Sequence, residues 1–301
     1  MDKSPQTYYK VTNCLEIHNG YVYKDGLNIL DKPFEKEGTC VKGGLYFTKL
    51  KYIDLYYGFG VNLREVTLPD SDPDFLMVKD PEGKKYRANK IILGEKYSLF
   101  DPKTYKLFDL DVVKNTFLIN HVSALGFIDV LNWWTRKRLP MAYDADALVL
   151  ASQNGQIMVL DWWQHASRRF GLQLQYDNDA MTLASRVGQI AVLNWWKHSG
   201  LELKYDQNAL MEASEMGQIT VLNWWLTSNL ELRYDQGTLI SAATHGHDHV
   251  LDWWFSSGLE LIYDEFSTEH SNKEYHARIM KRKQHFELNK FKIVKFNRTE
   301  L

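Results

Sequence analysis

Three histidines and an aspartate fall within five residues late in the chain, in the run His245-Gly246-His247-Asp248-His249. Imidazole and carboxylate groups at this close spacing are ligands that a zinc ion accepts. A closed zinc site needs further ligands, and the sequence places neither a cysteine nor a second histidine cluster beside this run. We therefore interpret it as a turn between two helices, and we predict neither a metal site nor a cofactor.

A second candidate for chemistry lies in the N-terminal third. The run Gly44 to Thr48 is strand-like, a tyrosine-rich segment follows it, and Glu65 lies on the next strand-like run. This order resembles ADP-ribosyltransferase-like folds, and the resemblance implies NAD as the substrate and Glu65 as the catalytic acid. We favour the alternative that these are ordinary core residues of a sheet. The sequence also lacks a phosphate-binding loop, a nucleophile elbow and a His-Glu-x-x-His motif, so we predict no enzyme and no catalytic residue.

The composition argues against several other classes of protein. A formal net charge of -2 and a pI near 6.6 do not fit a chain built to bind nucleic acid. No stretch approaches the roughly 18 apolar residues of a membrane span, and the N-terminus lacks the apolar region of a signal peptide. The cysteines, Cys14 and Cys40, are too few for a disulfide framework. We expect an intracellular monomer with no membrane partner.

The ten tryptophans show how the chain is organised, because all of them occur as adjacent pairs. Each pair closes the sequence Val-Leu-Asn/Asp-Trp-Trp, and successive pairs are 29, 33, 29 and 29 residues apart. A fixed period of this length is typical of a solenoid of helical repeats. Solenoids mostly present binding surfaces rather than catalytic pockets.

Five units follow from this period: residues 116–144, 145–177, 178–206, 207–235 and 236–264. In each unit a short helix ends at a glycine, a second helix carries the tryptophan pair, and an extended connector ends in Tyr-Asp. The second unit has four extra residues around Ser167–Phe170. The aspartate is expected to cap the next helix, with the tyrosine packed below it.

These units resemble ankyrin repeats. In the third unit, Ala184-Ser185 takes the place of the family's Ala-Ala, Gly188-Gln189 that of Gly-His, and Trp195-Trp196 that of Leu-Leu. The units are shorter than the usual ankyrin length, and the deficit lies in the connector, which implies a clipped hairpin finger. The resemblance implies stacked helix pairs from 116 to 264 that bind a protein partner.

Adjacent residues on a helix cannot both face the same way, so the two tryptophans of a pair must differ in environment. We predict that the second one fills the core between repeats. These core residues are Trp134, Trp163, Trp196, Trp225 and Trp254. The alternative is a partly exposed tryptophan row that binds a partner. Positions that vary while the repeat pattern stays fixed are the candidates for partner contact. In the second helices these are Met158, Ala191, Thr220 and His249.

Residues 1–115 carry no repeat. Dense turns separate strand-like runs, which include Leu63–Leu68 and Lys90–Leu93, and Tyr52–Tyr57 could form a short helix, so we predict a small α+β domain. Three of its runs resemble the N-terminal domain of ankyrin repeat proteins from giant, mimivirus-type DNA viruses. They are Asp25–Leu30, Cys40–Thr48 and Tyr86–Leu93. This resemblance implies a viral protein in an infected cell, located in the host cytoplasm.

Residues 265–301 lose the Trp-Trp sequence and are basic. From Lys273 to the end the side-chain charge is +6. The run Lys281–Lys283 could be a nuclear-import or nucleic-acid patch, but we favour a solvated capping helix because terminal repeats need a polar outer face.

The predicted fold is thus mainly α, an ankyrin-type solenoid preceded by a small α+β domain and followed by a basic cap. The predicted function is a scaffold that binds a host or viral protein. Two alternatives stay open: the ADP-ribosyltransferase-like enzyme, and a ubiquitin-ligase substrate adaptor, a role that some viral ankyrin proteins have.

Overall fold

The computed structural model describes residues 7–261 and 273–298, and in the second segment the side chains of 274–288. The chain divides into two compact units: Met1–Val122 with Asp129–Tyr143, and Ser123–Ile128 with Asp144–Leu301. The predicted fold class is confirmed, since helices dominate and a small sheet precedes them. The domain boundaries at 115 and 264 stay predictions.

The first unit is built on a seven-stranded antiparallel sheet in which neighbouring strands follow the order β4-β9-β6-β1-β5-β8-β7. A separate hairpin pairs β2 with β3. The strands are β1 Tyr8–Thr12, β2 Ile17–His18, β3 Tyr21–Val22, β4 Gly26–Ile29, β5 Leu45–Thr48, β6 Asn62–Thr67, β7 Met77–Lys79, β8 Lys85–Ala88 and β9 Lys90–Ser98. The 3-10 helix η1, Leu50–Phe59, contains the segment predicted to be helical, and α1, Pro102–Leu107, and η2, Val112–Lys114, follow the sheet.

The central strand β1 is paired unevenly on its two sides. It pairs with β6 along its whole length, from Tyr8 opposite Val66 to Thr12 opposite Asn62. Its register with β5 contains a single pair, Tyr9 opposite Thr48. Apolar side chains on one face, among them Tyr8 and Val66, form a buried core. On either side of the Tyr9–Thr48 pair, β1 and β5 are therefore not held together by further ladder pairs.

A buried ion pair fixes the loop that precedes β5. The guanidinium of Arg87 lies 2.9 Å from Asp80 Oδ2, and both side chains are fully buried. Arg87 also donates to the carbonyl oxygens of Glu35 and Glu37. Asp80 in turn accepts from the backbone amide of Cys40. These bonds satisfy two charges that would otherwise be costly to bury, and they hold the loop against the sheet.

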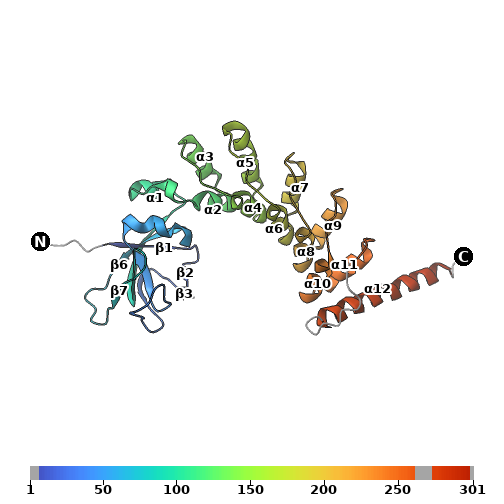
Figure 1. Cartoon of the computed structure of the whole chain (residues 1–301), viewed down its shortest axis with the longest axis horizontal. Coiled ribbons are helices and arrows are strands. Elements are labelled where there is room, and N and C mark those ends of the chain that lie inside the picture. Colours follow the sequence, from blue (N-terminus) through green and yellow to red (C-terminus); the bar gives the residue numbers. More distant parts are fainter. Residues whose placement is uncertain (1–6, 262–272, 299–301) are drawn as a thin grey trace. The chain divides into compact units, whose positions relative to one another are not determined.

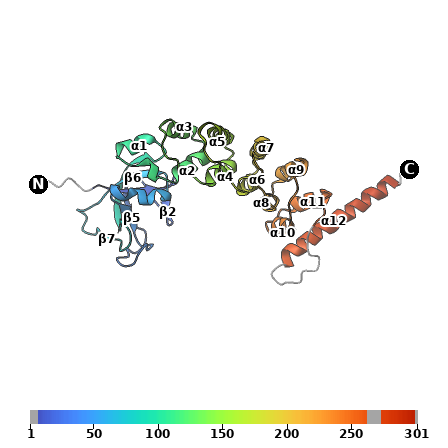
Figure 2. The same cartoon turned by 45° about the horizontal axis from the view of Figure 1, so that its top comes forward.

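Beyond the sheet the chain forms pairs of helices, one pair to a repeat, as the period predicts. The first helices are α2 Leu118–Leu125, α4 Asp146–Gln153, α6 Asp179–Arg186, α8 Asn208–Glu215 and α10 Gln236–Thr244, and the second helices are α3 Ile128–Arg136, α5 Ile157–Phe170, α7 Ile190–His198, α9 Ile219–Thr227 and α11 Asp248–Ser256. In the second compact unit, α4, α6, α8 and α10 pack in one row, and α5, α7 and α9 pack in another (Figures 1 and 2).

Local sequence signals set the ends of these helices. The aspartates of the Tyr-Asp pairs each accept a hydrogen bond from the backbone amide two residues further on, which satisfies a free donor at the start of the first helix. They are Asp144, Asp177, Asp206 and Asp235. Asp235 is the N-cap of α10, so the capping role is confirmed there. Asp144, Asp177 and Asp206 lie one residue before the N-cap positions of α4, α6 and α8, where their bonds form the turn that leads into the helix. Tyr263-Asp264 lies outside the described residues. The four extra residues of the second repeat lengthen α5, which ends at Gly171 with a φ of +69°.

The last helix, α12 (Lys273–Arg298), packs against α10 and α11. Ile279 is buried there, and Phe286 stacks on Phe255 with ring centroids 6.5 Å apart. Arg278 Nε lies 2.5 Å from Asp248 Oδ1, and the hydrogen bond holds the pKa of Asp248 below its usual range. These contacts tie a basic helix to the end of the repeat array.

Candidate interaction surface of the repeats

The second tryptophan of each pair is buried. Trp134, Trp163, Trp196, Trp225 and Trp254 are at most 1% exposed. In four of them the indole N–H donates to a buried serine of the preceding repeat at 2.9–3.0 Å. The donor–acceptor pairs are Trp163–Ser123, Trp196–Ser152, Trp225–Ser185 and Trp254–Ser214. Burying one indole contributes roughly 4–6 kcal/mol, so these residues couple neighbouring repeats strongly.

The first tryptophan of each pair is only half-buried, yet Trp195, Trp224 and Trp253 also reach into the preceding repeat. Trp224 Nε1 donates to Asn194 Oδ1 at 2.8 Å, and Trp253 Nε1 donates to Asn223 Oδ1 at 2.7 Å. Each acceptor is the residue that precedes the tryptophan pair of the previous unit. In the last repeat that position is Asp252, and Arg282 of α12 forms an ion pair with it. Arg282 of α12 thus contacts this position in the last repeat as the indole of the following repeat does in the earlier ones.

The tyrosines of the Tyr-Asp pairs add a third row of contacts between repeats. Tyr205 donates through its hydroxyl to the carbonyl oxygen of Glu231 at 3.2 Å, and its ring lies 5.0 Å from that of Trp225. Arg233 lies over the same ring, 5.0 Å from the centroid. Tyr176 and Tyr234 make the equivalent bonds to the connectors that follow them. The residues that recur in the sequence of each unit therefore make the contacts that hold neighbouring repeats together.

The variable positions of the second helices lie at the surface. Met158, Ala191, Thr220 and His249 are all exposed, and Met158 most clearly, at 72%. Each is the second residue of its helix, directly after the turn from the first helix. His249 Nε2 lies 3.3 Å from the carbonyl oxygen of Gly217 in the preceding repeat. These four side chains therefore lie at equivalent points of successive repeats and differ in size and polarity.

The structure adds a second variable row that the sequence reasoning missed, on the first helices. Arg186 Nη1 lies 2.9 Å from Glu212 Oε2, and Arg186 Nη2 lies 3.9 Å from Glu215 Oε1. His245 Nε2 lies 3.8 Å from the same Glu215 oxygen. The residues just before the turn glycines are exposed and include Val187 and Met216. A comparison of equivalent positions in the first helices could have found this row, because their residue types vary from unit to unit as those of the second helices do.

The residues singled out for chemistry lie on α11 and the turn before it and, in the first unit, on β5 and β6. The rings of His247 and His249 lie 5.5 Å apart, while Asp248 is engaged by Arg278. Within residues 7–261 and 273–298, no group of three or more His, Cys, Asp or Glu side chains is placed to hold a metal ion. Glu65 lies on β6, where its Oε1 accepts from the hydroxyl of Tyr97 at 3.2 Å. In the same part of the chain no helix is both long and apolar enough to span a bilayer.

The helix pairs and their recurring contacts define a repeat protein of the ankyrin type. No protein-family model matches the chain. Several proteins of Acanthamoeba polyphaga mimivirus do. "Putative ankyrin repeat protein R868" is 43% identical over 129 residues, which are 41% of this chain and 64% of that protein. R896, of the same description, is 46% identical over 108 residues, 35% of this chain and 32% of its own. "Uncharacterized protein R869" is 51% identical over 105 residues, 34% of this chain and 75% of its own.

The chain belongs to this family of mimivirus ankyrin repeat proteins. Its match spans less than two thirds of the length of R868 and about a third of R896. Among solved structures, the human ASB11 ankyrin repeat domain matches 55% of this chain and 82% of that domain, with 14% identity and a TM-score of 0.40.

Proposed function

We propose that the protein is a non-enzymatic scaffold whose repeats bind a folded protein of the host cell, in the host cytoplasm. The partner contacts the surface around the turns between first and second helices. We define this turn surface by the residues before the turn glycines, such as Val187 and Met216, and by the exposed second residues of the second helices. The latter are Met158, Ala191, Thr220 and His249.

One observation carries the proposal. Residues that recur from repeat to repeat are buried or bonded to the next repeat, as Trp225 is to Ser185. Residues that vary at a fixed register are exposed, as Ala191 and Thr220 are. A rigid array with exchangeable surface side chains suits recognition, because a preformed surface loses little conformational entropy on binding. Exposed apolar groups on the turn surface, Met158 and Met216 among them, supply area that a partner can cover.

The test compares two variants that each carry four added arginines on the same helices. The surface variant combines Met158→Arg, Ala191→Arg, Thr220→Arg and His249→Arg. The control variant changes four exposed residues in the C-terminal halves of these helices: His165→Arg, His198→Arg, Thr227→Arg and Ser256→Arg. Both sets add the same formal charge when histidine is neutral. Each variant is first checked by thermal unfolding, since an arginine near a helix N-terminus costs roughly 0.3–1 kcal/mol.

Full-length wild type and both variants then serve as baits for amoebal lysate, and the affinity of each captured protein is measured after purification. The proposal predicts a partner that the wild type and the control variant retain and that the surface variant binds at least about ten-fold more weakly. Equal binding by the two variants would place the interface elsewhere. If no protein is retained stoichiometrically by the wild type, the scaffold function itself fails.

A further inference from the structure

A cavity of about 290 Å³ lies in the first unit, beside the point where β1 and β5 stop pairing. Its wall includes Tyr9 and Lys10 from β1, and Tyr46 and Thr48 from β5. Because the two strands share a single register pair, at Tyr9 and Thr48, the chain beyond it leaves space that a continuous sheet would close. The volume is close to the lower end of the range for small-molecule sites, roughly 300–1,000 Å³.

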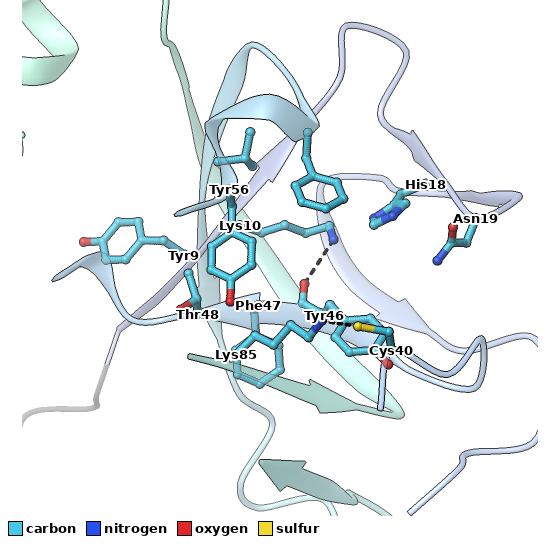
Figure 3. A pocket seen from close by; sticks show the side chains of 12 residues that line it. Tyr9, Lys10, His18, Asn19, Cys40, Tyr46, Phe47, Thr48, Tyr56 and Lys85 are labelled. Carbon is cyan, nitrogen blue, oxygen red and sulfur yellow. Dashed lines mark hydrogen bonds between the residues drawn. The ribbon is translucent and has the colours of Figure 1, made fainter. Parts of the chain in front are cut away.

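Lys10 extends into the wall of this cavity instead of into solvent (Figure 3). The residue is 4% exposed, although lysine is almost never fully buried in proteins without a partner for its charge. Its Nζ donates to the carbonyl oxygen of Tyr46 at 3.0 Å and lies 4.4 Å from the ring centroid of Tyr23. Within the described part of the chain, no carboxylate lies within ion-pair distance of it. A carbonyl and a ring are weak partners for a buried ammonium group.

Two further cationic or ionisable groups face the same space. Lys85 Nζ donates to Cys40 Sγ at 2.7 Å and lies 5.1 Å from the ring centroid of Tyr46. His18 lies across the cavity from β5 in Figure 3, and its pKa is lowered by burial and then by the charges of Lys10 and Lys85. The described residues that line the cavity include no aspartate and no glutamate. Lys10 and Lys85 are therefore the only lysine, arginine, aspartate or glutamate side chains in the described lining, and their charge is positive when protonated.

Aromatic side chains complete the wall. Tyr46 and Tyr56 are half-buried, and Phe59 lies next to His18 with ring centroids 5.4 Å apart. Flat rings of this kind offer large apolar area to a ligand ring at low entropic cost. The Tyr46 hydroxyl is held by the carbonyl oxygen of Val41, so its ring is fixed in place. Positive charge and rigid rings in one small cavity define the ligand that would suit it.

We propose that this cavity binds a small aromatic anion, a single flat ring that carries one carboxylate or phosphate group. The acid group lies between Lys10 and Lys85, and the ring packs against the tyrosine side chains. The bound anion supplies the ion-pair partner that Lys10 lacks within the described part of the chain, where Glu16 acts on it only from beyond ion-pair distance. Ionised hydrogen bonds of this kind are stronger than neutral ones, and the burial of Lys10 strengthens the bond that its ammonium group donates. This site is independent of the repeats and of the partner proposed for them.

The test is isothermal titration of the full chain with four probes: phenyl phosphate, benzoate, inorganic phosphate and benzyl alcohol. The proposal predicts that at least one of the two ring-bearing anions binds at least about ten-fold more tightly than both inorganic phosphate and the neutral alcohol. Whichever ring-bearing anion binds more tightly identifies the acid group. No binding of either up to roughly 10 mM, or equal binding of the alcohol, would overturn the proposal.

Variants locate the site. Lys10→Met and Lys85→Met should each weaken binding of the anion by about ten-fold or more, because each removes a charge-assisted hydrogen bond. Lys103→Met, on an exposed face of α1, is the matched control and should leave it unchanged. If Lys10→Met fails to fold, as judged by its thermal transition, the Lys85→Met variant alone decides the question. Unchanged affinity in the folded lysine variants of the cavity would overturn the assignment.

Discussion

The serine–tryptophan bonds between repeats make a quantitative prediction about stability. Ser185 of α6 and Trp225 of α9 are both fully buried, and the indole Nε1 lies 3.0 Å from the serine Oγ. Ser185→Ala removes the acceptor and leaves a buried N–H without a partner, which costs about 1–3 kcal/mol. The better helix propensity of alanine returns a few tenths of a kcal/mol. The expected net loss in the free energy of unfolding is about 0.5–2.5 kcal/mol.

The assay is urea unfolding of the full chain followed by far-UV circular dichroism, with Ser241→Ala as the control. Ser241 lies in the first helix of the next repeat but one and is only half-buried, so its replacement should change the free energy of unfolding by less than about 0.5 kcal/mol. Trp225→Phe removes the donor instead. In that background Ser185→Ala should cost about 1 kcal/mol less than in the wild type. Equal costs in the two backgrounds, or a loss below about 0.5 kcal/mol, would refute the bond as a coupling element.

Three further predictions follow. Gly188→Ala should lower the free energy of unfolding by roughly 1–2 kcal/mol in the same urea assay, because φ is +82° there and the new Cβ would lie 2.9 Å from Gln218 Oε1. Arg278→Ala should speed amide exchange in α12 while leaving α6 unchanged, since it removes the ion pair with Asp248; the half-exposed pair is worth less than about 1 kcal/mol, so global stability should hardly move. Burial lowers the pKa of Lys10 to about 7, although the charge of Glu16 acts to raise it. An aryl anion needs the protonated amine, so at higher pH its binding is accompanied by uptake of a proton from the solvent onto Lys10. Affinity should therefore fall by up to about ten-fold per pH unit above about pH 7, and titration in two buffers should detect the proton uptake unless Lys10 is not the site.

The pH prediction depends on which groups face Lys10. Their own titration must be separated from that of the lysine. On the neighbouring elements they are Glu16, His18, Tyr23, Cys40, Tyr46, Tyr56 and Lys85. Burial raises the pKa values of Tyr23, Tyr46 and Tyr56, so these tyrosines stay protonated over the range measured. The pKa of His18 is lowered from its ordinary value and that of Lys85 is raised. Between pH 7 and 9, neither group therefore loses its proton with the midpoint expected of Lys10.

The repeats could be predicted because their signal is redundant. The period, the turn glycines and the Tyr-Asp caps all indicate the same helix pairs. The sequence predicts that the second tryptophan of each pair is a core residue, but it could not give the partner of either indole, because that depends on where the neighbouring repeat lies. The partner is Ser185 for Trp225 and Asn194 for Trp224. The row of Arg186 and Glu215 was missed for the same reason, since the pairing joins first helices of different units.

The N-terminal unit was harder to predict because its pairings are distant in sequence. Strand-like runs such as those of β6 and β9 stand out in the sequence, whereas β1 contains a lysine and short strands such as β4 lie among turns. The cavity is lined by Lys10, Tyr46 and Lys85, which lie on three different strands, so no local sequence motif indicates it. The one available hint was a lysine flanked by Tyr-Tyr and Val in a strand-like run. Its burial follows from the central place of β1 in the sheet, which sequence pattern alone does not give.

Binding of a protein through the turn surface can be tested by hydrogen exchange of the full chain with and without its captured partner. Slower exchange is expected in the segments that flank the turns, residues 187–192 and 216–221, with unchanged exchange at the opposite ends of the same helices. Protection confined to strands of the N-terminal sheet, with the turn segments unaffected, would contradict it and move the interface to the first unit.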